Sequence, residues 1–238
     1  MNIVDIHQLT LVFDEQPLFS HLNFHLKQGE WTVLLGRSGV GKSTLLRTIA
    51  GLEQQAVSHG NIHIQAEHKI AWLAQQDSLY PWLSIVDNVQ LEQHLTNTKT
   101  TASKAQAISL LQRVGLGEHL HKACYQLSGG QRQRVALART LMQQADIILM
   151  DEPFSALDAV TRLQLQNLSC ELLQGKTVML VTHDPQEAIR LGNRLYILEN
   201  QPVTVREVAH LPETCPHQLE QHQLWQLQNQ LVQQLLED

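Results

Sequence analysis

The chain is poor in the features that mark membrane-spanning and secreted proteins. Its longest apolar runs, such as Ile147–Met150 and Val178–Val181, fall far short of the roughly 20 residues that a helix needs to cross a bilayer. The three cysteines, Cys124, Cys170 and Cys215, are widely spaced and contain no CxxC pair, so we expect reduced thiols and no disulfide framework. Any role at a membrane must therefore depend on a partner protein.

Targeting signals and positive charge are equally sparse. The N-terminal sequence MNIVDIHQLT has no basic start followed by an apolar stretch, so no targeting peptide is expected and the protein should stay in the cytoplasm. The net charge of −6 gives no broad positive field, and nucleic acid is therefore not an expected partner. His59, His63 and His68 lack the spacing of known metal sites, so we predict no structural zinc.

What is present is enough apolar sequence for one substantial core, since 43% of the 238 residues are apolar. We predict one domain with an insertion. Short apolar or alternating segments favour β-strands, and we expect them at residues 3–13, 22–26, 31–35, 62–64 and 70–73. A turn is expected at residues 58–61 and a helix at residues 42–50.

The middle of the chain changes to helical periodicity. Apolar residues recur three or four positions apart in residues 86–95, 102–114 and 131–142, which predicts a helical subdomain. The runs 147–150 and 178–181 are typical of strands buried on both faces of a parallel sheet. A β-rich stretch, Pro202–Val208, precedes a Gln-rich tail in which Leu224, Leu227, Leu231 and Leu235 follow helical spacing.

A phosphate-binding loop is the clearest chemical signal. Residues 36–43, GRSGVGKS, fit the pattern GxxxxGK[ST], in which glycines let backbone N–H groups turn towards phosphate oxygens. Lys42 would reach the β- and γ-phosphates, and Ser43 would offer its hydroxyl to Mg²⁺. An ordinary glycine-rich turn is the alternative, but the apolar strand before the loop and the helix after it favour a nucleotide site.

Two carboxylates follow the buried run 147–150. Asp151 and Glu152 stand at the carboxyl end of a predicted parallel strand, where ligands of such sheets collect. Asp151 suits Mg²⁺, and Glu152 suits the task of orienting and polarising an attacking water. Taken alone, these residues are equally compatible with acidic groups that simply end a strand at the surface.

A second anion site is predicted at residues 127–131, LSGGQ. Ser128 and the N–H groups of Gly129 and Gly130 precede a strongly helical run, so they would lie at a helix N-terminus. Gln131 completes the motif. An ordinary capped helix start is the simpler explanation of this segment by itself.

Together these motifs resemble the nucleotide-binding subunit of ATP-binding-cassette (ABC) transporters. GRSGVGKST matches Walker A, LSGGQ the signature and IILMDE Walker B, in the order of the family and over about residues 3–208. The resemblance implies ATP and Mg²⁺ as ligands, with ATP contacts from the residues Phe13, Gly36, Arg37, Ser38, Gly39, Val40, Gly41, Lys42, Ser43, Thr44 and Gln75.

The resemblance also implies roles for residues outside the three motifs. Gln75 matches the Q-loop glutamine, which helps Ser43 and Asp151 hold Mg²⁺. Asp158 matches the D-loop aspartate, and His183 matches the switch histidine that contacts the γ-phosphate. The catalytic residues expected from the resemblance are Glu152, His183 and Lys42. Phe13 fits the aromatic residue that stacks on adenine, although a place in the core is the alternative for a single phenylalanine.

The implied fold is an α/β P-loop NTPase core with a mainly parallel sheet, an N-terminal antiparallel β-subdomain and an inserted helical subdomain. We expect the core at residues 1–75 and 143–215, the helical subdomain at 76–142 and a helical tail at 216–238. In this family the signature of one subunit closes over the Walker A nucleotide of another. The resemblance therefore implies a homodimer in which Ser128, Gly129, Gly130 and Gln131 act in trans.

A finer resemblance concerns transport. LYPWLSIVDNV (residues 79–89), MDEPFSALDAVTR and VTHDPQEAI are similar to ATPases of bacterial importers for nitrate, sulfonates, taurine and thiamine precursors. This implies a transmembrane permease, indirectly a periplasmic solute-binding protein, and a position on the inner face of the cell membrane. Trp82 would face the permease, or alternatively only pack the helical subdomain. Ser155 and Tyr125 depart from the usual pattern of this branch.

The rival hypothesis is an ABC ATPase that acts without a permease, on ribosomes or DNA. Ribosome-acting members usually carry two cassettes, and DNA-repair members carry a long coiled coil; neither feature is found in this sequence. A scaffold without turnover is disfavoured because Lys42, Asp151, Glu152 and His183 are all present.

Overall fold

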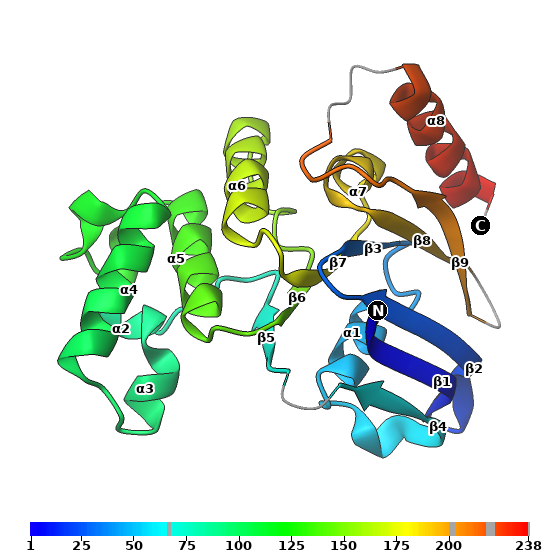
Figure 1. The fold of residues 1–238 in the computed structure, drawn as a ribbon, viewed down its shortest axis with the longest axis horizontal. Helices are drawn as coiled ribbons and strands as arrows, with labels where there is room; N and C mark the ends of the chain where they lie inside the picture. The colour runs from blue at the N-terminus through cyan, green and yellow to red at the C-terminus, as the bar shows by residue number, and fades with distance from the viewer. Residues whose placement is uncertain (66–67, 200–202, 218–221, 238) are drawn as a thin grey trace. The chain divides into compact units, whose positions relative to one another are not determined.

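The computed structural model describes residues 1–65, 68–199, 203–217 and 222–237. The chain divides into two compact units (Figure 1). The first, the loop unit, consists of Met1–His68, Leu149–Glu152 and Leu173–Asp238; the second, the helical unit, consists of Lys69–Ile148 and Pro153–Leu172. The helical unit is thus wider than the subdomain expected at 76–142, because it also includes a helix and a strand from outside that range.

An antiparallel sheet in the loop unit has the strand order β2-β1-β4. Its strands are β1 (Asn2–Phe13), β2 (Gln16–Lys27) and β4 (Val57–Ile64). Alternating side chains of β1, among them Val4 and Ile6, are buried, as expected for a sheet with one covered face. The antiparallel N-terminal subdomain is thereby confirmed.

The turn predicted at residues 58–61 is wrong, because these residues lie inside β4. Gly60 has φ +83°, and a Cβ atom there would lie 2.3 Å from the carbonyl oxygen of Gln8 on β1. The pairing of β1 with β4 shifts register between His7 and Thr10. The glycine therefore marks a β-bulge with close backbone approach and not the end of a strand.

The larger sheet has the strand order β5-β6-β7-β3-β8-β9. Its strands are β5 (Ile70–Leu73), β6 (Ile147–Asp151), β7 (Thr177–Thr182), β3 (Trp31–Leu35), β8 (Arg194–Glu199) and β9 (Thr204–His210). β3 runs parallel to β7 and β8, while β9 is antiparallel to β8. Every residue of β3 and β7 is buried, which explains their uninterrupted apolar or β-branched sequences. Pro202, predicted to begin the last strand, lies outside the described residues.

Three α-helices of the loop unit are described: α1 (Lys42–Ile49), α7 (Pro185–Leu191) and α8 (His222–Glu237). The Asp184 carboxylate caps α7 by accepting hydrogen bonds from the N–H groups of Gln186 and Glu187, and Pro185 occupies the first turn. The predicted tail helix is confirmed in α8, where Leu231 is fully buried. Within the described ranges, no helix has both the length and the apolar character needed to span a membrane.

The helical unit contains α2 (Ile85–Val89), α3 (Leu91–Leu95), α4 (Thr101–Arg113), α5 (Gly129–Met142) and α6 (Ala159–Leu172). Side chains such as Val89, Leu111 and Val135 form its buried core. The single helix predicted at residues 86–95 is two helices, because Gln90 leaves the helical conformation between them. Helix α6 was not predicted: its apolar residues Val160 and Leu163 are exposed, so its sequence shows little amphipathic pattern.

Candidate functional site

The loop between β3 and α1 has the geometry of an anion cradle. Gly39 and Gly41 have φ values of +85° and +108°, a conformation that side chains rarely adopt. A Cβ atom on Gly41 would also lie 3.2 Å from the side chain of Leu18. Because Gly41 directly precedes α1, the free N–H groups and the positive dipole end of that helix point at the loop.

Lys42 is the first residue of α1, and its side chain reaches back to the loop. Its side chain is 4% exposed, and its Nζ donates hydrogen bonds to the carbonyl oxygens of Gly36, at 2.7 Å, and Arg37, at 2.8 Å. Burial lowers the pKa of the Lys42 ammonium, while the nearby carboxylates of Glu152 and Asp151 oppose that shift. A buried cation beside a glycine-rich loop at a helix N-terminus is suited to bind an oligophosphate.

The Ser43 hydroxyl donates a 2.7 Å hydrogen bond to Oδ1 of Asp151. These two oxygen atoms come from the start of α1 and the end of β6. A hydroxyl beside a carboxylate is a donor set of the kind that Mg²⁺ prefers, completed by phosphate oxygens and water. The chemistry of these two side chains therefore fits the predicted metal, and their role as its ligands stays a prediction.

Glu152 and His183 lie next to one another beyond the ends of β6 and β7. Oε2 of Glu152 is 3.0 Å from Nδ1 of His183, and the Glu152 backbone N–H donates to the carbonyl of Val181 at 3.0 Å. Glu152 has φ +45°, a left-handed conformation that costs a residue with a side chain roughly 1–2 kcal/mol. The strained backbone directs the carboxylate to a position beside the histidine, where the pair can orient a water and transfer its proton.

The remaining predicted ATP contacts of this unit come from the loop, the first turn of α1 and the end of β1. Ser38, Val40 and Thr44 belong to the loop and the first turn of α1, where the carbonyl of Thr44 accepts from the Thr48 hydroxyl. Phe13 ends β1 and pairs with Gln16 across the hairpin. Its side chain is 39% exposed, so the alternative of a core residue does not describe it, and its role as an adenine platform stays a prediction.

The signature segment forms the N-terminus of α5 in the helical unit. The Ser128 hydroxyl accepts from the Gln131 N–H at 3.3 Å, and the Gln131 side chain accepts in return from the Ser128 N–H at 3.0 Å, which is a capping box. A Cβ atom on Gly130 would meet Thr161 of α6 at 2.4 Å, whereas one on Gly129 would meet only an Arg132 nitrogen at 3.9 Å. Gly130 therefore permits close packing against α6, whereas Gly129 leaves space at the helix N-terminus, where an anion can bind.

Gln75 and Asp158 also belong to the helical unit. The Gln75 Nε2 atom donates to Oγ of Ser155 at 3.2 Å, so Ser155, which departs from the usual pattern of the importer branch, supplies a hydrogen-bond acceptor. Asp158 accepts from the Thr161 N–H at 3.0 Å at the start of α6. Hydrogen bonds from Thr161 lower the pKa of the Asp158 carboxyl group.

Gln133 is a residue of this network that the sequence reasoning missed. Its side chain is 4% exposed and its Nε2 donates to the carbonyl oxygen of Pro153 at 2.7 Å, with longer contacts to those of Gln75, at 3.4 Å, and Ala74, at 3.5 Å. One amide on the signature helix therefore holds both the Q-loop and the segment that follows Glu152. A polar residue in helical register with the buried Leu137 and Thr140 was the only available signal.

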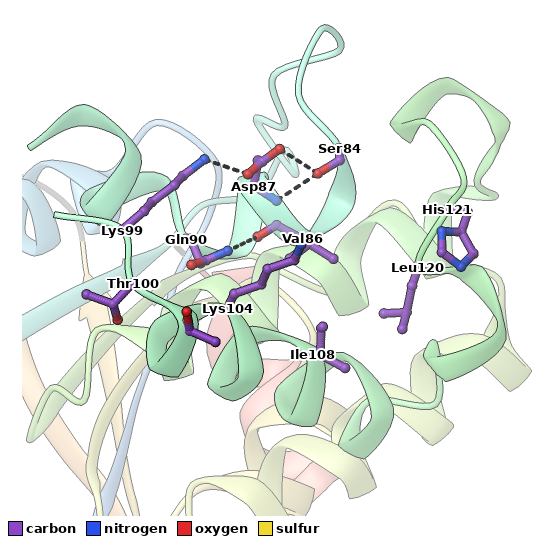
Figure 2. Close-up of a pocket in the computed structure, with 11 residues that line it drawn as sticks. Ser84, Val86, Asp87, Gln90, Lys99, Thr100, Lys104, Ile108, Leu120 and His121 are labelled. Carbon is purple, nitrogen blue, oxygen red and sulfur yellow. Dashed lines mark hydrogen bonds and ion pairs between the residues drawn. The ribbon is translucent and has the colours of Figure 1, made fainter. Parts of the chain in front are cut away.

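A large groove lies on another part of the helical unit (Figure 2). It has a volume of about 1180 Å³ and is lined by apolar side chains, among them Val86, Ile108 and Leu120, and by polar ones that include Lys99, Lys104 and His121. Lys99 forms an ion pair with Asp87, which also accepts from Ser84. The hydrogen bond from Lys99 is the main cause that lowers the pKa of the Asp87 carboxyl group.

Two exposed aromatic residues precede this groove in the sequence. Trp82 is 75% exposed, which excludes the alternative that it only packs the helical subdomain. Its ring lies edge-on to that of Tyr80, with 5.1 Å between the centroids. Such exposed aromatic pairs are enriched at binding surfaces.

Comparisons with known proteins agree with this arrangement. The family model described as ABC transporter matches residues 19–155. The chain is 55% identical over 236 residues to an uncharacterised ABC transporter ATP-binding protein of Haemophilus influenzae, with 98% of both chains covered. The chain belongs to the ABC transporter family, so the resemblance drawn from the motifs is confirmed.

More distant relatives carry transport names. An aliphatic sulfonates import ATP-binding protein of Rhodococcus jostii is 41% identical over 231 residues, covering 94% of this chain and 90% of the relative. A taurine import ATP-binding protein of Ruegeria pomeroyi is 37% identical over 226 residues, covering 89% and 83%. A chain of a solved ABC transporter, assigned to the metal-chelate type and in an inward-facing conformation, superposes with a TM-score of 0.76 at 27% identity, covering 87% of this chain and 84% of that one.

These findings confirm the predicted α/β cassette fold and the predicted activity. The chain is an ATP-binding ATPase of the ABC family. The roles of the individual residues, Lys42, Glu152 and His183 among them, stay predictions that rest on the geometry described above.

Proposed function

We propose that the chain is the ATP-hydrolysing subunit of a bacterial importer for a small solute of the nitrate, sulfonate, taurine or thiamine-precursor type. The catalytic part rests on two hydrogen-bonded pairs, Ser43–Asp151 at 2.7 Å and Glu152–His183 at 3.0 Å. The buried Lys42 ammonium interacts electrostatically with the carboxylates of both pairs. The transport part is supported by relatives named as sulfonate and taurine import ATP-binding proteins.

In this proposal ATP binds over the loop 36–44, with its phosphates against the backbone N–H groups and the Lys42 ammonium. Ser43 and Asp151 would hold Mg²⁺, with Gln75 as the further ligand that the family resemblance implies, and the ion would neutralise charge at the phosphates. Glu152 orients the attacking water and accepts its proton, and His183 holds the carboxylate and contacts the γ-phosphate. Phe13 stacks on the adenine ring.

A second copy of the chain completes the site. Ser128, Gly129, Gly130 and Gln131 of one subunit close over the nucleotide of the other, so two ATP molecules lie in a head-to-tail homodimer. Closure accompanies ATP binding, and hydrolysis allows reopening. The glycine-lined N-terminus of α5, where a Cβ atom at Gly129 would meet little, supports this role.

The permease docks on the helical unit in this proposal. The groove of Figure 2 is lined by apolar side chains, by Lys104 and His121, and by the ion pair of Lys99 with Asp87. A cytoplasmic permease segment with apolar and acidic side chains would complement the apolar lining and Lys104. The exposed Tyr80 and Trp82 extend the contact area. The chain would then be peripheral at the inner face of the cell membrane, while a periplasmic solute-binding protein acts on the permease from the other side.

The first experiment tests hydrolysis. Glu152→Gln should keep ATP affinity and lower turnover by roughly 10²–10⁴-fold, because the amide cannot accept the proton of the water. ATP should then shift this variant towards a dimer in light scattering. Glu171→Gln, an exposed glutamate on α6, is the matched control and should behave as the wild type; near-normal turnover of Glu152→Gln would refute the role assigned to Glu152.

The second experiment tests coupling. The pair Lys99→Glu and Lys104→Glu should lower the ATPase rate measured with a reconstituted candidate permease, and leave the rate of the isolated chain unchanged. Lys122→Glu, which reverses an exposed charge outside the groove, is the matched control. If the isolated chain hydrolyses ATP and no permease encoded beside it changes the rate, the alternative of an ABC ATPase that works without a permease is supported instead.

A further inference from the structure

The C-terminal helix α8 reaches the phosphate loop. It packs against α7 (Figure 1) and is anchored by Leu231, whose side chain is 0% exposed. The carbonyl oxygen of Leu235, in its last described turns, accepts a 3.0 Å hydrogen bond from Nε of Arg37. Arg37 is the second residue of the Walker A motif, so residues 198 positions apart are joined at the nucleotide loop.

Arg37 is held at both its side chain and its backbone. While its guanidinium group contacts α8, its own carbonyl oxygen accepts the 2.8 Å hydrogen bond from Nζ of Lys42. A cation is favoured at the C-terminal end of a helix, where the carbonyl groups carry partial negative charge. The contact therefore has both a geometric and an electrostatic basis.

Ordering the phosphate loop costs conformational entropy. Its backbone includes Gly39 and Gly41 at positive φ, and glycine loses more conformational freedom on ordering than any other residue. A ligand that binds an unordered loop must supply this entropy from its own binding free energy. A contact that orders the loop in advance raises nucleotide affinity without touching the nucleotide.

We infer that α8 positions the phosphate loop through Arg37, and that Arg37 acts as a positioning residue for Lys42. The inference gives the Gln-rich tail a role in nucleotide binding. It rests on the ATP site proposed above, because only a loop that binds nucleotide gains affinity by being ordered.

The test is a double-mutant cycle on ADP affinity, which involves no hydrolysis. The four proteins are the wild type, Arg37→Ala, a chain that ends at Gln234, and the combination of the two changes. Each single change should weaken ADP binding roughly two- to fivefold, the range for a cation at a helix C-terminus. The combination should be no weaker than the more affected single variant, because both changes remove the same contact.

A second readout separates positioning from general destabilisation. Amide hydrogen exchange of residues 36–41 should become faster in both single variants, and exchange in residues 231–234 should become faster in Arg37→Ala. Arg47→Ala, which removes an exposed arginine that faces Glu53 at 3.9 Å, is the control and should change neither ADP affinity nor exchange in these segments.

The possible failures are distinguishable. If the wild type does not bind ADP, the proposed nucleotide site is wrong. Suppose that the wild type binds ADP, but the losses of ADP affinity from the two changes are additive, or the loop amides exchange at the same rate in Arg37→Ala as in the wild type. The role proposed for α8 is then wrong, while the proposed nucleotide site is retained. If the shortened chain does not fold, the exchange rates of residues 36–41 and 231–234 in Arg37→Ala still test the role of α8.

Discussion

Replacing Gln133 by leucine should destabilise the protein out of proportion to the small change in shape. Leucine fills a similar volume, so packing is kept, but the 2.7 Å hydrogen bond to the Pro153 carbonyl is lost. Both residues are buried, and a buried carbonyl left without a donor costs about 1–3 kcal/mol. For a chain of this length, a loss of about 2 kcal/mol corresponds to a Tm lower by about 4–8 °C.

Gln133→Glu gives a second, pH-dependent prediction at the same place. A deprotonated glutamate would face the carbonyl oxygens of Pro153, Gln75 and Ala74, so its pKa in the folded state should be raised above its unfolded value. The folded state then binds more protons, and the stability of this variant should fall as pH rises through the raised pKa. A protonated glutamic acid still donates, so at acidic pH the variant should approach the wild type.

Urea and thermal unfolding, followed by circular dichroism at several pH values, measure both effects. Gln112→Leu is the control, because Gln112 is an exposed residue on α4, where substitutions change stability by about 0.5 kcal/mol or less. The reasoning is refuted if Gln133→Leu unfolds at the same temperature and urea concentration as the wild type. It is also refuted if Gln133→Glu is less stable than the wild type by the same amount at pH 5 and pH 8.

Three further outcomes are expected. Phe13→Ala should weaken ATP binding by a factor of about two to ten, the value of one aromatic stacking contact. Calorimetry should detect no change in the binding of inorganic tripolyphosphate, which has no adenine. Equal losses of affinity for both ligands would contradict the stacking role. Ser155→Ala, which removes the acceptor of the Gln75 amide, should raise the Mg²⁺ concentration for half-maximal ATPase activity about two- to tenfold, and Ser155→Thr should restore it. Burial lowers the pKa of His217, whose Nε2 lies 3.1 Å from the carbonyl oxygen of Gly192. As pH falls through about 6.5, the unfolded chain therefore binds more protons than the folded chain, and the folded state loses stability. This loss of stability at acidic pH should be smaller in His217→Gln.

Those parts of the fold with a strong local pattern could be predicted from the sequence. The strand at residues 31–35 and the helix that ends at Met142 were found because burial on both faces, or on one helical face, shapes their composition directly. Helix α6 could not be found in this way, since only a minor part of its surface is buried. Gly60 was misread because a glycine that permits a bulge has the same local signal as one that permits a turn.

In the candidate site, too, some residues could be predicted from the sequence and others could not. Lys42, Ser43, Asp151 and Glu152 could be named in advance, because the phosphate loop and the end of a buried strand leave motifs that are contiguous in sequence. The partners of Arg37 and Gln133 could not, since those contacts join segments that only folding brings together. Long-range hydrogen bonds to backbone carbonyls leave no trace in the residue type of the acceptor.

The left-handed backbone of Glu152 has a consequence for how this protein can be improved in the laboratory. Glycine or asparagine tolerates φ +45° better than glutamate, so the wild-type residue lowers stability for the sake of where its carboxylate lies. A library varied at position 152 and selected only by survival of heating should enrich glycine and asparagine, and the enriched proteins should be inactive. Selection by ATP turnover should return glutamate, and thermostabilisation of this cassette must therefore be sought at other positions.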